Sequence, residues 1–148
     1  MSDSIIECDL VSYWYGLKTP SPVQALEEVS LSIEAGQRIG VVGHTGSGKS
    51  TFVQLLNALL LPTNGVVKVF GEDTSSKTTD LKALRKRVGL VFQFPEHQLF
   101  EETVWQDVAF GPRQMALDEK EVSRHAERAL ADMGLDTEKI VDRSPFEL

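Results

Sequence analysis

Apolar positions in the first third of the chain follow the two-residue repeat of β-strands. Apolar and aromatic residues dominate Ile5–Tyr15, and in Ala25–Ile33 the apolar Val29, Leu31 and Ile33 alternate with serines. This pattern predicts two strands, the second with one buried face. Short apolar runs rich in β-branched residues predict three further strands: Arg38–Val42, Val66–Phe70 and Val88–Phe92.

A leucine-rich helix is predicted for Lys49–Leu61, ended by Pro62–Gly65. Asp80 is placed to cap a short helix that runs through Lys86, with Leu81 and Leu84 facing inward. The core face of the first helix is predicted to hold the apolar residues at helical spacing: Phe52, Leu55, Leu56, Leu59 and Leu60.

Helical spacing dominates the last third of the chain. Asp118 and Glu121 have the spacing of a capping box, and Gly134 is placed to end the helix that follows. A second helix is predicted for Thr103–Phe110. Strands followed by helices predict an α/β core with an appended helical part. The apolar stripe of the last helix is Val122, Ala126, Ala129, Leu130 and Met133.

The stretch Gly43–Thr51 fits the phosphate-binding pattern G-x-x-x-x-G-K-[ST] at every required position. A predicted strand precedes it and a predicted helix follows, which is the context in which this loop binds polyphosphate. Gly46 and Gly48 allow successive backbone N–H groups to point inward. We expect Lys49 to reach the β- and γ-phosphates and Ser50 to bind Mg²⁺, with the Thr51 hydroxyl near the α-phosphate.

Composition narrows the possible functions. The 148 residues amount to about one domain, with 41% hydrophobic and 25% charged residues. A net charge of −7 argues against a nucleic-acid-binding domain. Cys8 is the single cysteine, so no intrachain disulfide is possible and a reducing compartment is expected. The longest apolar run, Ala58–Leu61, is too short to span a bilayer.

The chain resembles the ATP-binding subunits of ABC transporters over essentially its whole length. The resemblance rests on four matches in order. They are the aromatic stretch Tyr13–Tyr15 before Ala25–Ile33, the loop Gly43–Thr51, the run Leu61–Val67, and Leu84–Gln93, which is similar to the run into the family's Q-loop. The run Phe92–Phe100, together with Thr103–Val104 and Asp107–Pro112, is similar to energy-coupling-factor ATPases of vitamin and cobalt or nickel importers.

The resemblance implies an α/β fold, the P-loop NTPase core of an ABC ATPase. Residues 1–92 would hold the first part of the core with its N-terminal antiparallel β-subdomain. Residues 93–148 would hold the Q-loop and the beginning of the α-helical subdomain. The run Ser144–Leu148 resembles the approach to the family's signature motif, so we expect an incomplete cassette, a fragment of a longer ATPase.

ATP and Mg²⁺ are the ligands that the resemblance implies. Tyr15 would stack on adenine, with Tyr13 and Trp14 as alternatives. Gln93 would contact Mg²⁺ or the attacking water, so Ser50 and Gln93 form the expected metal site and Gln93 and Lys49 assist catalysis without completing it. The triphosphate would be held by Gly43, His44, Thr45, Gly46, Ser47, Gly48, Lys49, Ser50 and Thr51.

The implied partners are transporter membrane subunits, contacted through Pro95–Phe100, and a second ABC ATPase in a homo- or heterodimer. The implied location is peripheral, at the cytoplasmic face of the membrane. The implied function couples ATP binding and hydrolysis to uptake of a vitamin or metal ion, although we expect the 148 residues alone not to hydrolyse ATP. The alternative is a non-catalytic nucleotide-binding or regulatory fragment. An ABC-type ATPase acting on DNA or ribosomes, and a small-molecule kinase, fit the sequence less well.

Overall fold

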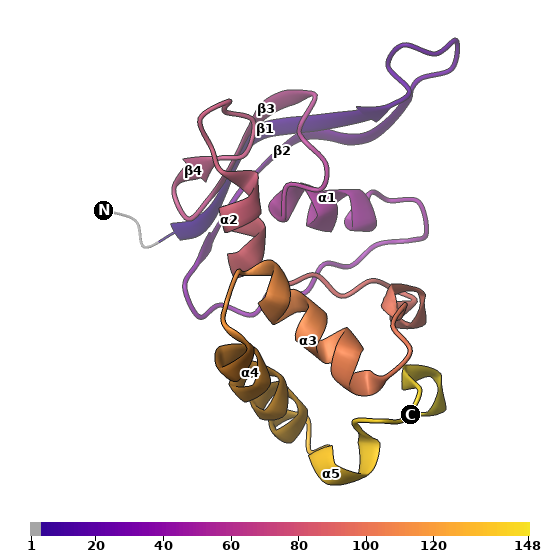
Figure 1. The fold of residues 1–148 in the computed structure, drawn as a ribbon. Helices are drawn as coiled ribbons and strands as arrows, with labels where there is room; N and C mark the ends of the chain where they lie inside the picture. Colours follow the sequence, from indigo (N-terminus) through magenta and orange to yellow (C-terminus); the bar gives the residue numbers. More distant parts are fainter. Residues whose placement is uncertain (1–3) are drawn as a thin grey trace. The chain divides into compact units, whose positions relative to one another are not determined.

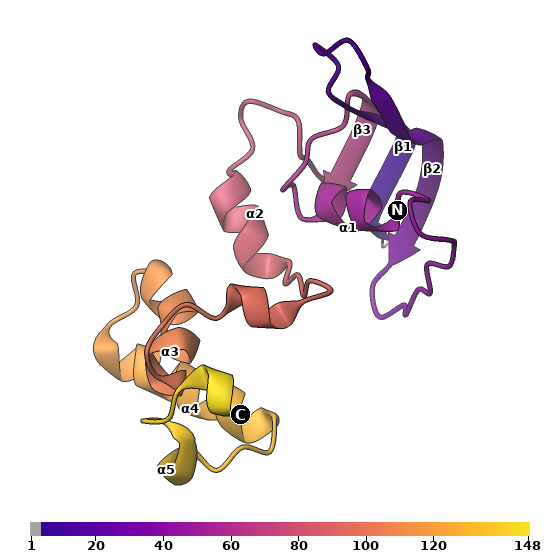
Figure 2. The same cartoon turned by 90° about the vertical axis from the view of Figure 1, so that its right-hand side faces the viewer.

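The computed structural model describes residues 4–148, which form two compact units, residues 4–90 and 91–148. The first unit is built on a four-stranded antiparallel sheet with the order β2-β1-β3-β4. Figure 2 shows β1, β2 and β3 side by side. The strands predicted at Ile5–Tyr15, Ala25–Ile33 and Val66–Phe70 are confirmed. The observed strands are β1 (Ser4–Tyr15), β2 (Val23–Glu34), β3 (Asn64–Val69) and β4 (Glu72–Asp73).

Paired irregularities twist the long β1–β2 hairpin. Leu10 and Glu28 both have positive φ, at 46° each. The Leu10 N–H donates to the hydroxyl of Ser30, and the Glu28 N–H donates to the hydroxyl of Ser12, both at 2.9 Å. Each serine thus satisfies an amide that leaves the regular ladder, which is how an irregular sheet avoids unpaired backbone groups.

Helix α1 (Lys49–Leu56) packs against one face of this sheet (Figure 1). Leu55 of α1 is fully buried with Val11 and Val67 of the sheet, and Phe52 is 7% exposed. Burying each such side chain stabilises the fold by about 2 kcal/mol. The prediction of Phe52 and Leu55 as core residues is confirmed.

The end of α1 differs from the prediction, which extended the helix to Leu61. Ala58 adopts a left-handed conformation with φ 57°, and the Leu59 side chain is 47% exposed rather than in the core. The Asn57 side chain accepts the Leu59 N–H at 3.0 Å, and the Arg85 guanidinium donates to the Ala58 carbonyl at 2.6 Å. These contacts satisfy backbone groups that continued helix would otherwise use.

Helix α2 (Leu81–Arg87) begins where the sequence predicts, because the Asp80 carboxylate accepts the N–H groups of Lys82 and Ala83. Leu84 is 2% exposed and Leu81 packs against the same core. The basic residues of α2 are Lys82, Arg85, Lys86 and Arg87, and all four are exposed. Two of them also make contacts, because the Arg85 guanidinium donates to the Ala58 carbonyl and the Arg87 guanidinium lies 3.7 Å from the centre of the Phe70 ring.

Two predicted strands do not form. Arg38–Val42 and the stretch 88–92 have no strand assignment, and Val42 and Val91 are 96% and 80% exposed. A strand is stable only when a neighbour satisfies its N–H and C=O groups. Among the described residues, neither stretch has such a neighbour. Beside residues 39–42, the apolar side chains of β2 and Phe52 line an open depression of about 420 Å³.

The second unit is helical. Two small clusters form its core, one of Val104, Leu130 and Ile140 and the other of Ala109, Val122 and Ala126. The Val104 N–H donates to the Arg143 carbonyl at 2.9 Å, which ties the start of α3 to the chain after α5. The elements are the 3₁₀ turn η1 (Pro95–Gln98), α3 (Val104–Gln114), α4 (Glu119–Asp132), α5 (Thr137–Ile140) and the turn η2 (Pro145–Glu147).

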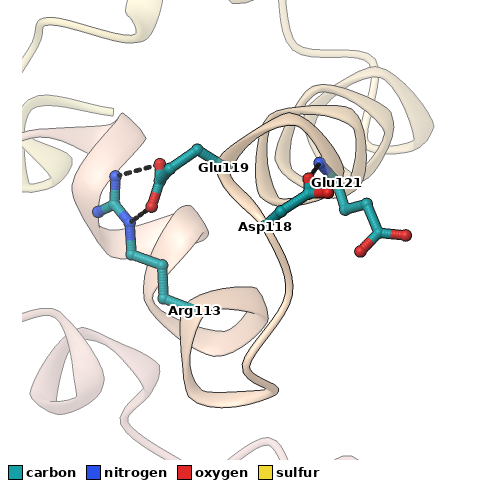
Figure 3. A network of polar contacts seen from close by, with 4 residues as sticks. All are labelled: Arg113, Asp118, Glu119 and Glu121. Carbon is teal, nitrogen blue, oxygen red and sulfur yellow. Dashed lines mark hydrogen bonds and ion pairs between the residues drawn. The ribbon is translucent and has the colours of Figure 1, made fainter.

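The helices of this unit begin at side-chain caps. Thr103 and Gln106 form a full capping box at α3, which the sequence analysis did not predict. At α4 the Asp118 carboxylate accepts the Glu121 N–H at 2.8 Å, so the predicted box is present only in its first half (Figure 3). Arg113 and Glu119 connect the two helices at 3.4 Å. Ala129 and Met133, predicted in the apolar stripe of α4, are exposed.

Candidate functional site

The loop of the phosphate-binding pattern leads directly into α1. Gly46 and Gly48 have φ of 84° and 86°, the left-handed region that glycine adopts at little cost. At Gly48 a β-carbon would overlap the carbonyl oxygen of Ala25 and lie 2.9 Å from the Leu26 side chain. The second glycine of the pattern is therefore required twice, for its backbone angle and for the close approach of β2. At Gly46 no atom lies within 4 Å of such a β-carbon.

The N-terminus of α1 directly follows the loop and has no side-chain cap. Gly48 is the N-cap residue and makes no side-chain hydrogen bond. The N–H groups of Lys49, Ser50 and Thr51 occupy the first turn, where an α-helix offers no internal acceptor. Uncapped N–H groups and the positive end of the helix dipole together favour an anion at this position.

Lys49 lies across the loop. Its ammonium group donates to the carbonyl oxygens of Gly43 and His44, both at 2.8 Å, and to the Ser47 hydroxyl at 3.3 Å. These three bonds use all three donors of the ammonium group. The His44 ring nitrogen Nδ1 lies 2.7 Å from the Thr45 carbonyl, so His44 is engaged with the backbone of the loop. The charge of Lys49 is thus held inside the loop by backbone dipoles.

Tyr15 at the end of β1 and Thr51 in α1 meet beside the loop. The Tyr15 hydroxyl lies 3.0 Å from Thr51 Oγ1. Thr51 is only 6% exposed, whereas Tyr15 is 43% exposed. Both line a pocket of about 240 Å³ whose other walls come from the loop, the start of α1 and the first residues of β2. The residues around it are Val23, Gln24, Ala25, Gly46, Ser47, Gly48, Lys49 and Ser50.

The three aromatic residues of β1 are in different surroundings. Tyr13 is partly buried against the core, and its ring meets that of Tyr15 edge to face with centroids 4.8 Å apart. Burial and the neighbouring Tyr15 raise the pKa of Tyr13. The pocket is lined by Tyr15, and neither Tyr13 nor Trp14 is among its lining residues.

Sequence analysis missed the contribution of Val23, Gln24 and Ala25 to this pocket. The Cα partner of Tyr15 in the hairpin is Val23. The short loop Gly16–Pro22 between two predicted strands could have indicated this contribution, because a short loop places the two strand ends opposite each other. Thr63 was also missed. Its hydroxyl accepts the Trp14 N–H at 3.1 Å, and its own N–H donates to the Ser12 carbonyl at 2.9 Å.

Gln93 and the predicted partner segment belong to the second unit. Gln93 is exposed, and its role remains a prediction. Phe94 and Phe100 are 54% and 62% exposed, whereas Trp105 packs against the Ala109 cluster of the helical core. Phe94 and Phe100 are therefore surface residues, whereas Trp105 belongs to the helical core.

No helix in residues 4–148 is long and apolar enough to cross a membrane. No group of three or more His, Cys, Asp or Glu side chains in this part of the chain is arranged to hold a metal ion. Any Mg²⁺ ligand supplied by the pocket-lining residues would be a hydroxyl or carbonyl oxygen, because no carboxylate lines the pocket.

A glycine-rich loop that surrounds a lysine and leads into a helix packed on a sheet is the arrangement of a phosphate-binding P-loop. The profile of a family described as "ABC transporter" matches residues 26–148. Because that match covers more than half of the chain, the chain belongs to this family. The resemblance and the fold class inferred from the motifs are confirmed.

Curated relatives narrow the similarity to one group. Energy-coupling factor transporter ATP-binding protein EcfA2 of Symbiobacterium thermophilum is 54% identical, over 95% of this chain and 48% of the relative. The EcfA2 proteins of Caldanaerobacter subterraneus and Streptococcus pneumoniae are 47% and 50% identical over 97% of this chain, and 50% and 52% of their own lengths. The chain spans about half the length of the curated relatives it matches.

Solved structures of ABC ATPases share the fold. CbiO1 of Clostridium perfringens, described as part of the ABC transporter complex cbiONQ, matches with TM-score 0.77 and 30% identity, covering 94% of this chain and 54% of that chain. The ATP-binding cassette MJ0796, in a dimeric structure bound to ADP and Pi, matches with TM-score 0.81 and 26% identity over 97% of this chain and 62% of that chain.

Proposed function

We propose that this chain binds ATP as part of the ATPase subunit of an energy-coupling-factor importer, in which ATP binding and hydrolysis drive uptake of a vitamin or a metal ion. The observation that carries the proposal is the loop geometry: two left-handed glycines, an uncapped α1 N-terminus, and a Lys49 ammonium group bonded to the loop carbonyls of Gly43 and His44. The group of relatives supports the importer context.

The loop residues Gly43–Thr51 hold the phosphates in this proposal. The first-turn N–H groups of α1 and the bent backbone around Gly46 supply donors that match an anion. Lys49 exchanges one of its bonds to the carbonyls of Gly43 and His44 for a charge-assisted bond to the β- or γ-phosphate, which is the stronger interaction. The exposed Ser50 hydroxyl is the proposed Mg²⁺ ligand of this unit.

Tyr15 is the proposed adenine-stacking residue. It is the aromatic residue of β1 that lines the pocket, and more than a third of its surface is open to a ligand. A flat aromatic face stacks on a base without needing a specific hydrogen-bond pattern. The Tyr13 ring against its edge holds it in place.

Hydrolysis in this proposal needs groups beyond the pocket. Phosphoryl transfer to water requires a group that positions the water and Mg²⁺ ligands around the phosphates. No carboxylate lines the pocket, and Gln93 is the proposed water- or Mg²⁺-contacting group. A second ABC ATPase subunit, as in the dimeric MJ0796 structure, would complete the site. We propose that the 148 residues alone bind ATP without turning it over.

The surface proposed for the membrane subunit is the Pro95–Phe100 segment. Its exposed Phe100 ring packs edge to face on Phe110, with centroids 4.8 Å apart, and Phe94 lies beside His97 at 5.6 Å. Exposed aromatic rings at close spacing are typical of protein interfaces. Binding there would place the protein at the cytoplasmic face of the membrane as a peripheral subunit.

ATP binding and turnover test the proposal. Lys49→Ala is expected to lower the affinity for ATP about ten- to a hundredfold, which is the effect of losing a charge-assisted hydrogen bond. Lys86→Ala, at an exposed lysine of α2, is the matched control and is expected to leave binding unchanged. Equal ATP affinity in the wild type and Lys49→Ala would contradict the proposal. Turnover by the 148 residues alone would contradict the division of the site between two subunits.

A further inference from the structure

A single hydrogen bond joins the two ends of the proposed ATP site. Tyr15, the last residue of β1, is the proposed adenine-stacking residue, whereas Thr51 is the third residue of α1 and lies beside the phosphate loop. Their hydroxyl oxygens are 3.0 Å apart. The inference drawn from this contact rests on the proposed function, because it concerns how the same site orients the phosphates.

We propose that Tyr15 is a positioning residue for the phosphates and acts through Thr51. A hydroxyl group offers one proton and two acceptor positions. When the Tyr15 O–H donates to Thr51 Oγ1, the proton of Thr51 remains available for a second acceptor. Phosphate oxygens only accept, so this direction of donation is the one that serves a bound phosphate. The Tyr15–Thr51 bond thus turns the threonine hydroxyl into a donor toward the phosphate nearest α1.

Burial makes this orientation effective. Thr51 is only 6% exposed, and its branched side chain has few allowed rotamers in a helix. A hydroxyl in such surroundings keeps its partner, since an unpaired buried polar group is costly. A chain of two hydrogen bonds that ends on an anion is also polarised along its length, which strengthens each bond.

Contacts other than the Thr51 bond also hold the Tyr15 ring. Tyr13 packs against the Tyr15 ring edge to face, and Trp14, the residue before Tyr15, is bonded through its N–H to the Thr63 hydroxyl. Phenylalanine at position 15 therefore keeps the ring where it is and removes only the hydroxyl. This separates the proposed positioning role from stacking on adenine.

A double-mutant cycle measures the proposed coupling. The variants are Tyr15→Phe, Thr51→Val and the double variant. They are made in the full-length protein that contains these residues. Affinity for ATP, ADP and adenosine is measured by competition against a fluorescent ATP analogue. Tyr15→Phe is expected to lower the affinity for ATP and ADP about three- to tenfold, which is the effect of one lost hydrogen bond. The affinity for adenosine is expected to stay unchanged.

On the Thr51→Val background, Tyr15→Phe is expected to cost no further affinity. On the Thr51→Ser background, which keeps a hydroxyl, Tyr15→Phe is expected to lower the affinity for ATP as it does in the wild type. An equal loss on all backgrounds, no loss at all, or an equal loss for adenosine would overturn the inference. A purely structural bond would lower the melting temperature of Tyr15→Phe without changing nucleotide affinity.

The Lys49→Ala measurement separates this inference from the proposed function. If Lys49→Ala binds ATP more weakly than the wild type, while the cycle shows no coupling, the proposed function stands and the positioning role of Tyr15 is wrong. If the wild type and Lys49→Ala bind ATP equally, or neither binds it, the proposed function fails and this inference fails with it.

Discussion

The backbone of Gly48 lies directly against the carbonyl group of Ala25, so that a β-carbon on Gly48 would overlap the Ala25 oxygen. This contact joins the phosphate loop to β2, the strand whose first residues line the same pocket. The glycine is therefore a packing requirement of the sheet as well as a conformational requirement of the loop.

Replacing Gly48 with alanine tests this contact. Gly46 supplies a matched control because its φ of 84° is nearly the same as the 86° of Gly48, and its surroundings are open. Gly46→Ala is expected to lower the free energy of unfolding by about 1 kcal/mol, the cost of a left-handed alanine. Gly48→Ala is expected to cost more, because the overlapping atom is backbone. Urea unfolding without nucleotide measures both, and equal losses would contradict the close approach seen here.

Thr63 is predicted to stabilise the end of β1. Thr63→Val removes the acceptor of the Trp14 N–H and is expected to cost about 1–2 kcal/mol of unfolding free energy. Thr63→Ser keeps the acceptor and is expected to cost less. Because Tyr15 follows Trp14, the valine variant is also expected to weaken ATP binding. If Thr63→Val and Thr63→Ser lose the same unfolding free energy, the Thr63 hydroxyl does not stabilise the end of β1.

The capping box of α3 is predicted to contribute more than an exposed ion pair. Thr103→Ala removes the acceptor of the Gln106 N–H and is expected to cost about 1 kcal/mol. Arg128→Gln removes the pair with Asp132, whose side chains are 80% and 70% exposed, and is expected to cost less than about 0.5 kcal/mol. Hydrogen exchange of the α3 and α4 amides measures each loss locally. A larger effect for Arg128→Gln would reverse this ranking.

Cys8 is predicted to be unreactive in the folded protein. Burial raises the pKa of its thiol to about 11, and the side chain is 5% exposed. The thiolate is the nucleophile, so at pH 8 the folded protein presents almost only the protonated thiol, whereas an ordinary thiol with a pKa near ~8.5 is partly ionised. Labelling with a thiol reagent is expected to be slow at pH 8 and fast in urea. Fast labelling of the folded protein would contradict the burial of Cys8.

The elements that local interactions specify could be predicted correctly from the amino-acid sequence. The alternation in Ala25–Ile33, the glycine spacing in Gly43–Thr51 and the Asp80 cap each carry their own physical signal, and each appears where predicted. The same motifs indicate the ABC transporter family, and the family profile confirms it. These signals depend on neighbours in the chain, which is why they can be read from one sequence.

Tertiary structure decided what depends on distant partners. Arg38–Val42 has the composition of a strand and remains unpaired, because a strand exists only when another strand satisfies its backbone. The left-handed turn that follows α1 is contacted from far along the chain, because Arg85 donates to the Ala58 carbonyl. Tyr15, rather than Tyr13 or Trp14, lines the pocket and bonds to Thr51 because of where the end of β1 and the start of α1 meet in space. No periodicity in the sequence specifies these contacts, since they depend on how separate elements meet in space.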